Sequence, residues 1–300
     1  MSVIAIFGPT ASGKSAVALD LADLVGGEIV SSDAMQLYRG LPILTNQPSA
    51  PDRERVPHHL VGVWEPSHEG SVAEYADMAH AAVDDIIRRG RVPIVCGGSG
   101  LYLRAALADM PLPPQAPADV RTTAERLYDE RGPAGAHATL AAVDAPAAAA
   151  VHPNDRRRVV RALELAESGH SLAASETRLW SADTRHPTLV AGLAIPPAET
   201  ARRIAARTAA MFAAGVVDEV RAARAAHTFS TTAERIHGLQ DVSALLAGEI
   251  DRDEAIRRLE TRTRRYAKRQ RTWMRRLPDV RVVDATRDPR AVAGDIAGWA

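Results

Sequence analysis

The sequence predicts an α/β fold: a parallel sheet flanked by helices, with a mostly helical domain inserted into it. Short apolar strands alternate with helical segments in the N-terminal and C-terminal parts of the chain. That order is typical of parallel sheets with crossover helices. A glycine-rich loop joins the first strand to the first helix, and a long middle stretch shows no strand pattern.

The N-terminal part of the chain predicts three strands and three helices. Apolar, β-branched runs predict strands over residues 2–7, 28–32 and 92–96. Apolar residues at helical spacing, such as Val17, Leu21 and Leu24, predict a helix over residues 14–25. Further helices are expected over 72–89, where Gly90 is a stop signal, and over 101–107.

The chain changes character at residue 111. Four prolines (Pro111, Pro113, Pro114 and Pro117) open a segment that continues with alanine-rich helical patterns to Pro187. We therefore expect an α/β catalytic core over 1–110 and 188–300, with residues 111–187 as a helical insertion. A strand over 189–195, helices over about 198–276 and a last strand over 280–283 complete the predicted core.

Composition narrows the possible classes of protein. Among 300 residues, 46% are hydrophobic and 37 basic side chains balance 37 acidic ones, so net charge alone predicts no polyanionic partner. The single cysteine, Cys96, excludes a disulfide framework and a multi-cysteine zinc site. The N-terminal apolar stretch has no basic flank and is too short to span a membrane. We therefore expect a cytoplasmic protein with no membrane partner.

The loop after the first strand carries a phosphate-binding pattern. It matches G-x-x-x-x-G-K-[ST] with residues Gly8, Pro9, Thr10, Ala11, Ser12, Gly13, Lys14 and Ser15. Glycines let backbone N–H groups turn toward phosphate oxygens, the lysine adds a cation, and Ser15 can ligate Mg²⁺. Only two of the 37 basic residues are lysines, and Lys14 is one of them. The pattern predicts a P-loop NTPase-like core that binds a diphosphate or triphosphate with Mg²⁺.

This loop leaves the reaction open. Asp33 follows the second strand, at the edge of the sheet where open α/β folds bind ligands. It could act on the substrate, or it could simply cap the next turn. A small-molecule kinase, with Asp33 as a magnesium ligand, is one class that fits these residues.

Two basic clusters predict contact with RNA. Residues 257–276 hold ten basic side chains and one acid, Glu260, interleaved with Tyr266 and Trp273. Cations neutralise phosphates and aromatic rings can pack on splayed bases, so this run is typical of an RNA-binding helix. A second cluster in the insertion comprises Arg156, Arg157, Arg158 and Arg161.

Six blocks of the sequence resemble the tRNA dimethylallyltransferase family in its bacterial form. They are GPTASGKS, SSDAMQLYRGLPI, PHHL, VCGGSGLYLRA, HPNDRRRVVRALE and RRYAKRQRTWMRR, in the order that the family has them and over nearly the whole chain. The resemblance implies transfer of a dimethylallyl group from its diphosphate to the N6 amine of the adenosine beside the anticodon, position 37. It implies tRNAs that read codons beginning with U, and a monomer.

The resemblance also implies roles for particular residues. Asp33 would be the general base, with Thr10 and Lys14 assisting catalysis, and Arg235 would join the loop in binding diphosphate. The target base would leave its stack to reach Asp33. The residues expected to contact tRNA are Asp33, Ala34, Met35, Gln36, Ser99, Arg157, Arg158, Arg161, Arg235, Lys268, Arg269, Gln270, Trp273 and Arg275.

Two departures and several alternatives accompany this interpretation. Gln47 stands where many family members have lysine, and Leu239 stands where they have tyrosine.

His58 and His59 are interpreted as structural, since no third metal ligand lies nearby. The alternatives are prenyl transfer to free AMP or ADP, a P-loop small-molecule kinase, and a non-catalytic RNA-binding module. The basic clusters disfavour the first two, and the phosphate loop with Asp33 disfavours the last.

Overall fold

A computed structural model describes residues 2–299 except 111, 113–115 and 174–178. The chain divides into two compact units, Met1–Ala108 with Ala182–Ala300, and Asp109–Ser181. The first unit is called the core below and the second the inserted unit. The sequence placed the insertion at 111–187, so these bounds differ from it by a few residues at each end.

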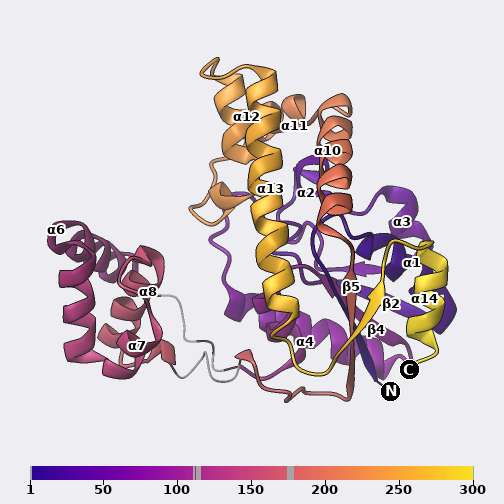
Figure 1. Ribbon diagram of the computed structural model, residues 1–300, viewed down its shortest axis with the longest axis horizontal. Helices are drawn as coiled ribbons and strands as arrows, with labels where there is room; N and C mark the ends of the chain where they lie inside the picture. Colours follow the sequence, from indigo (N-terminus) through magenta and orange to yellow (C-terminus); the bar gives the residue numbers. More distant parts are fainter. Residues whose placement is uncertain (1, 111, 113–115, 174–178, 300) are drawn as a thin grey trace. The chain divides into compact units, whose positions relative to one another are not determined.

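The core is built on a six-stranded sheet in which every pairing is parallel. Its strands are β1 (Val3–Phe7), β2 (Gly27–Ser31), β3 (His58–His59), β4 (Val92–Gly97), β5 (Thr188–Ala194) and β6 (Val280–Asp284). Their order across the sheet is β3-β2-β4-β1-β5-β6 (Figure 1). Every residue of the central strand β1 is buried, as expected for a strand covered on both faces. The predicted α/β class is confirmed.

Helices flank the sheet and rise above its carboxyl edge (Figure 1). They are α1 (Lys14–Val25), α2 (Pro42–Thr45), α3 (Ala50–Arg55), α4 (Val72–Arg88), α5 (Gly100–Leu107), α10 (Pro197–Ala213), α11 (Val216–Ala226), the 3₁₀ turn η1 (Ala233–Arg235), α12 (Leu239–Leu246), α13 (Arg252–Met274) and α14 (Pro289–Ala297). Leu21 of α1 and Val292 and Ile296 of α14 share one apolar cluster with strand residues such as Ile4 and Ile94. That packing fixes the helix that follows the phosphate loop.

Several short elements were not predicted. The strand β3 has only two residues and pairs through Ile29–His58 and Val30–His59, so it has too few residues for an alternating pattern. The helix α3 begins at a capping box of Ser49 and Asp52, a signal that the sequence does carry. The last helix, α14, also escaped prediction, although Asp288 caps it and proline follows at its first position.

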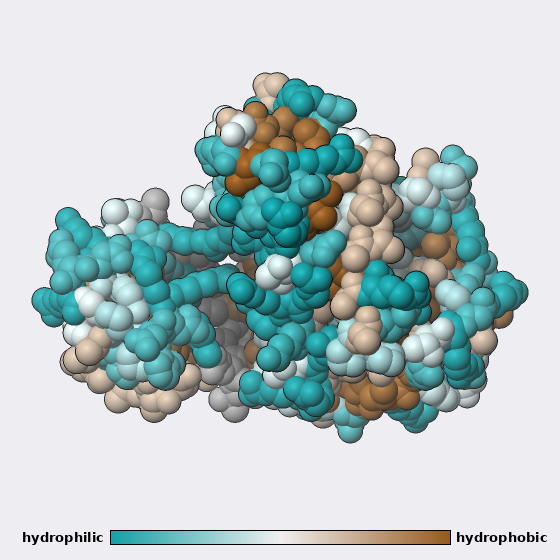
Figure 2. Space-filling view, turned by 45° about the horizontal axis from the view of Figure 1, so that its top comes forward, coloured by the Kyte–Doolittle hydropathy of each residue, from teal (hydrophilic) through white to brown (hydrophobic). Residues whose placement is uncertain are grey.

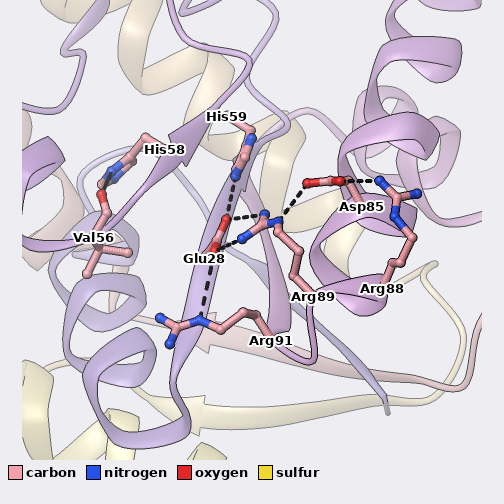
Figure 3. Close-up of polar contacts among 8 residues, drawn as sticks. All are labelled: Glu28, Val56, His58, His59, Asp85, Arg88, Arg89 and Arg91. Atoms are coloured by element: carbon pink, nitrogen blue, oxygen red, sulfur yellow. Dashed lines mark hydrogen bonds and ion pairs between the residues drawn. The ribbon is translucent and has the colours of Figure 1, made fainter.

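An ion-pair network around the buried Glu28 stabilises the end of the sheet where β2 begins (Figure 3). Glu28, only 4% exposed, accepts hydrogen bonds from the Arg89 guanidinium and lies 2.8 Å from His59 Nε2. The hydrogen bonds from Arg89 are the main reason that the pKa of Glu28 falls to about 2. The network links β2 to the edge strand β3 and to the residue after α4. His59 is therefore structural, as predicted.

The named secondary-structure elements of the inserted unit are all helices. It comprises α6 (Ala118–Val143), α7 (Ala145–Ala150) and α8 (Arg156–Glu167). A kink at Gly132, with φ of +67°, precedes Pro133 within α6. Tyr128, Leu140 and Val159 belong to its own apolar cluster, so the unit has a hydrophobic centre separate from that of the core.

The surface seen in Figure 2 is mostly hydrophilic, and its hydrophobic areas gather near the top and at the lower right of the view. The exposed large hydrophobic residues are Leu24, Val63, Val143 and Val282. Among the described residues, no helix has the length and apolar character that crossing a bilayer requires.

Candidate active site

The phosphate loop has the backbone shape that its sequence predicts. It follows β1, and Ala11 and Gly13 both have left-handed backbones, with φ of +64° and +89°. Such turns direct successive N–H groups toward one point and form an anion-binding concavity. Gly13 is also the N-cap of α1, so the positive end of that helix faces the same place.

The loop forms one wall of a cavity of about 440 Å³. Its lining includes Thr10, Lys14 and Ser15 from the loop, Asp33, Met35 and Gln36 from the segment after β2, Arg203, Arg207 and Met211 from α10, and Leu259, Thr263, Tyr266 and Gln270 from α13. The structure therefore brings the three predicted catalytic residues, Thr10, Lys14 and Asp33, into one cavity. These elements are far apart in sequence but meet at the carboxyl edge of the sheet.

Asp33 lies just beyond the end of β2 and is half-buried. Its Oδ1 accepts a hydrogen bond from the Met35 backbone N–H at 3.0 Å. Within the described part of the chain, its carboxylate forms no ion pair. This short turn holds the carboxylate on the cavity wall and leaves oxygen lone pairs available to a ligand.

The Lys14 side chain folds back onto the phosphate loop. Its Nζ donates to the Pro9 carbonyl at 2.8 Å. Burial lowers the pKa of Lys14 from 10.5 to about 8, although the charge of Asp33 partly opposes this shift. A diphosphate would supply the counter-charge that this ammonium lacks.

Two arginines of α10 that the sequence analysis missed also line the cavity. Arg203 is held by Glu199 Oε1 at 2.6 Å, whereas Arg207 Nε is buried and has no hydrogen-bond partner among the described residues. Burial lowers the pKa of Arg207. The available signal was the spacing of Arg203, Arg207 and Met211, which puts them on one face of a helix that was predicted. Ser12 Oγ and Ser32 Oγ, near the same edge, are likewise buried without partners.

The segment from Gln36 to Gln47 forms a hydrogen-bonded loop at the cavity rim. Gln36 Nε2 donates to the Asn46 carbonyl at 2.7 Å, and Gln36 Oε1 accepts from Ser31 Oγ at 2.9 Å. Gln47 Nε2 donates to the Tyr38 carbonyl at 2.7 Å and to the Gln36 carbonyl at 3.3 Å. Gln47 therefore closes the loop without a charge, where many family members have lysine.

His237 and Tyr266 meet edge-to-face in the cavity wall, with ring centroids 4.6 Å apart. Burial, and then the charge of Arg269, lowers the pKa of His237 to about 4, so its ring is neutral at pH 7. Burial raises the pKa of Tyr266. The wall on this side is thus uncharged and largely aromatic.

Other predicted residues lie outside this lining. Arg235 is exposed at the end of η1, so its predicted contact with diphosphate stays a prediction, while Arg203 and Arg207 line the cavity instead. Lys268, Arg269 and Arg275 are exposed on or beside α13, where RNA could reach them. Arg157 and Arg158 belong to α8 in the inserted unit, as does Arg161, which pairs with Glu164 at 3.0 Å.

Taken together, the parallel sheet, the loop after its central strand and the cavity at its carboxyl edge define a P-loop-like α/β protein. A family model described as IPP transferase matches residues 36–277, and one described as isopentenyl transferase matches residues 1–57. Since the first covers most of the chain, the chain belongs to the tRNA dimethylallyltransferase (IPP transferase) family, and the resemblance of the sequence blocks is confirmed.

Individual relatives agree with this assignment. The chain is 42% identical over 293 residues to the tRNA dimethylallyltransferase of Anaeromyxobacter dehalogenans, covering 98% of each chain. It is 44% identical over 296 residues to that of Nocardia farcinica, covering 98% of this chain and 93% of the relative. Both relatives are named as dimethylallyltransferases, and dimethylallyl is a prenyl group. This chain is therefore a prenyltransferase by class.

Solved structures give the same result. A tRNA isopentenylpyrophosphate transferase from Bacillus halodurans matches with a TM-score of 0.72 at 32% identity, covering 99% of this chain and 95% of that one. A eukaryotic dimethylallyltransferase acting on tRNA matches with a TM-score of 0.77 at 29% identity, covering 95% of this chain and 74% of that one.

Proposed function

We propose that this protein transfers the dimethylallyl group of dimethylallyl diphosphate to the N6 amine of adenosine 37, beside the anticodon, in tRNAs that read codons beginning with U. One observation carries the proposal: the Asp33 carboxylate and the phosphate loop line the same cavity. A diphosphate held by the loop and an amine facing Asp33 would then meet within it. The names of the relatives, which refer to tRNA, support the same substrate.

On the donor side, the allylic C–O bond breaks, leaving positive charge on carbon and negative charge on the departing diphosphate. The Thr10 hydroxyl, the Lys14 ammonium and the loop amides other than that of Thr10 would stabilise that negative charge. Arg207 of α10, whose Nε has no partner among the described residues, would add a guanidinium in the same cavity. Together these groups make diphosphate a better leaving group.

The residues present also fit a magnesium ion that is held mainly by substrate phosphates. Ser15 lines the cavity next to Lys14, while the described residues include no group of three or more histidine, cysteine or acidic side chains that could hold a metal. Mg²⁺ commonly keeps several waters and binds through substrate phosphates with few protein ligands. When bound, it would neutralise charge on the diphosphate, and Ser15 would orient it.

On the acceptor side, the adenine N6 amine is a weak nucleophile because its lone pair is delocalised into the ring. Asp33 would accept a hydrogen bond from this amine and take its proton as the new C–N bond forms. The adenine must leave its stack to reach a half-buried carboxylate, so we propose base flipping. Exposed cations of α13 and α8 would hold the anticodon stem-loop, and we propose that the enzyme acts as a cytoplasmic monomer.

A transfer assay with radiolabelled dimethylallyl diphosphate and Mg²⁺ tests the proposal. The acceptors are an anticodon stem-loop with adenosine at position 37, the same stem-loop with guanosine there, and AMP. We expect label on the adenosine stem-loop alone. Label on AMP alone would reassign the protein to prenyl transfer onto free nucleotides, and phosphate transfer from ATP without prenylation would make it a kinase.

A further inference from the structure

Three glycines at the carboxyl edge of the sheet make room for three side chains at the end of α13. A Cβ atom on Gly98 would lie 2.2 Å from Gln270 Nε2, and one on Gly100 would lie 1.8 Å from Trp273. A Cβ atom on Gly192 would lie 3.2 Å from the Met274 sulfur. The helix is therefore seated closely against the backbone that surrounds the phosphate loop.

Gln270 makes the polar contact in this seat. Its Oε1 accepts a hydrogen bond from the Thr10 backbone N–H at 2.7 Å, and its Nε2 donates to the Gly98 carbonyl at 2.8 Å. The residue is only 3% exposed. A side-chain amide so deeply buried normally uses its hydrogen-bonding groups inside the protein, and both of its polar ends do so here.

The two sides of α13 face different surroundings. Leu259, Thr263, Tyr266 and Gln270 recur every three or four residues and all line the cavity. A second groove, on another side of the helix, is lined by Arg257, Arg258, Thr261, Arg262 and Arg265, together with Glu254. Gln270 thus lies within the basic run of residues 257–276, but on the side of α13 that faces the cavity.

We infer that Gln270 is a positioning residue for the donor diphosphate, acting through the phosphate loop rather than through contact with RNA. By fixing the Thr10 amide, it sets the direction of the Thr10 hydroxyl and of the loop amides that follow. The inference rests on the function proposed above and departs from the RNA contact expected for Gln270. The two roles predict opposite effects on the two substrates.

The test compares Gln270→Met with wild type, since methionine has similar length but cannot replace either hydrogen bond. We expect the KM for dimethylallyl diphosphate to rise about tenfold and kcat to fall, because the Thr10 amide loses its anchor. The Kd for the anticodon stem-loop, measured without donor, should stay within about twofold of wild type. Met274→Leu, a volume-conserving change in the same seat, is the matched control and should leave all three constants unchanged.

Gly98→Ala provides a second route to the same result, because the added methyl group must displace the Gln270 amide from the other side. It should also raise the donor KM and spare the RNA Kd, with all assays run well below the melting temperature of each variant. A weakened RNA Kd with an unchanged donor KM in Gln270→Met would overturn the inference and restore the RNA contact. Failure of the proposed function is separate, since wild type itself would then transfer no label to the stem-loop.

Discussion

An acidic side chain lies at each end of β2, and the two carboxylates have different hydrogen-bond partners. Glu28, near the start of the strand, is bound by Arg89 and His59 and is almost fully buried. Asp33, just past the end, accepts one short-range hydrogen bond from its own turn and forms no ion pair among the described residues. Asp33, which forms no ion pair among the described residues, thus lies only five positions after Glu28, whose carboxylate is fully paired.

The difference shows where this fold gains stability and where it keeps reactivity. At the starting edge, the buried carboxylate is matched by cations, so removing it leaves Arg89 and His59 without their charged partner. At the carboxyl edge, Ser12 Oγ, Ser32 Oγ and Arg207 Nε are buried without partners among the described residues. Such unsatisfied groups lower stability, and they are expected where a substrate completes the hydrogen bonding.

The largest effect should follow from Asp33→Asn. The amide keeps the shape but cannot take the proton, so we expect kcat for transfer to fall about 10²- to 10⁴-fold. The melting temperature should change little, because the carboxylate has no ion pair to lose. Rates from single-turnover transfer and a thermal melt measure the two quantities. A variant with nearly normal kcat would remove Asp33 from the role of base.

Arg207→Met should separate binding from stability. Loss of the guanidinium should raise the KM for the donor by about ten- to a hundredfold, since a charge-assisted hydrogen bond contributes about 1.5–3 kcal/mol. Because the change also removes a buried Nε that has no hydrogen-bond partner among the described residues, the free energy of unfolding should stay the same or increase. Steady-state kinetics and urea titration give both values, with Arg202→Met, an exposed neighbour on α10, as the control. A large loss of stability would show that Arg207 is structural.

The pKa of Lys14 predicts how donor use depends on pH. In the free enzyme this ammonium loses its proton near pH 8, so kcat/KM for the donor should fall about tenfold per pH unit above that value. Lys14→Arg, which keeps its charge, should have a flatter profile even if its rate is lower. An identical decline in both proteins would assign the titration to another group.

Glu28→Gln should lower stability without changing the chemistry. We expect a loss of about 2 kcal/mol in the free energy of unfolding, and a melting temperature lower by about 4–8 °C, because Arg89 and His59 lose their charged partner. The kcat of the folded fraction should match wild type, since Glu28 is not among the residues that line the cavity. A normal melting temperature would mean that the network adds nothing to stability.

The stability difference between wild type and Glu28→Gln should itself depend on pH. The folded-state pKa of Glu28 is about 2, below its ordinary value of 4.5. Its contribution is therefore fully present above about pH 4.5 and is lost as the pH falls through about 2. Urea titrations of both proteins at pH 7, 5 and 3 should give a difference that shrinks only at the lowest pH. A constant difference would contradict the ionic origin of the effect.

Much of the core could be predicted from sequence because its signals are local. The predicted helix over residues 14–25 coincides with α1, and the strands β1, β2, β4, β5 and β6 lie within about two residues of their predicted bounds. The phosphate loop and Asp33 were also accessible, since a motif and a strand end are both read along the chain. Elements held by tertiary contacts, such as the two-residue strand β3, leave no comparable pattern.

The parts of the cavity lining that come from α10 and α13 illustrate what one sequence cannot provide. Arg207 is one arginine among many in an arginine-rich chain, and only the packing of α10 over the phosphate loop gives it a distinct place. The family resemblance implied that Gln270 contacts tRNA, yet the side of α13 that it occupies depends on how the helix packs on the core. Which face of a helix meets a loop 260 residues away is a tertiary property.

The places where the chain leaves and re-enters the core have a consequence for protein engineering. The backbone N–H of Arg185 donates a hydrogen bond to the Leu107 carbonyl at 2.8 Å. The buried Arg104 guanidinium donates to the backbone carbonyl of Asp183 at 2.9 Å. These bonds lie within the core and join the two segments between which the inserted unit is placed in the sequence. A short glycine-serine bridge should therefore join residue 108 to residue 182 without unravelling the sheet. The same junction is therefore the place at which another module could replace the inserted unit while the core keeps its fold.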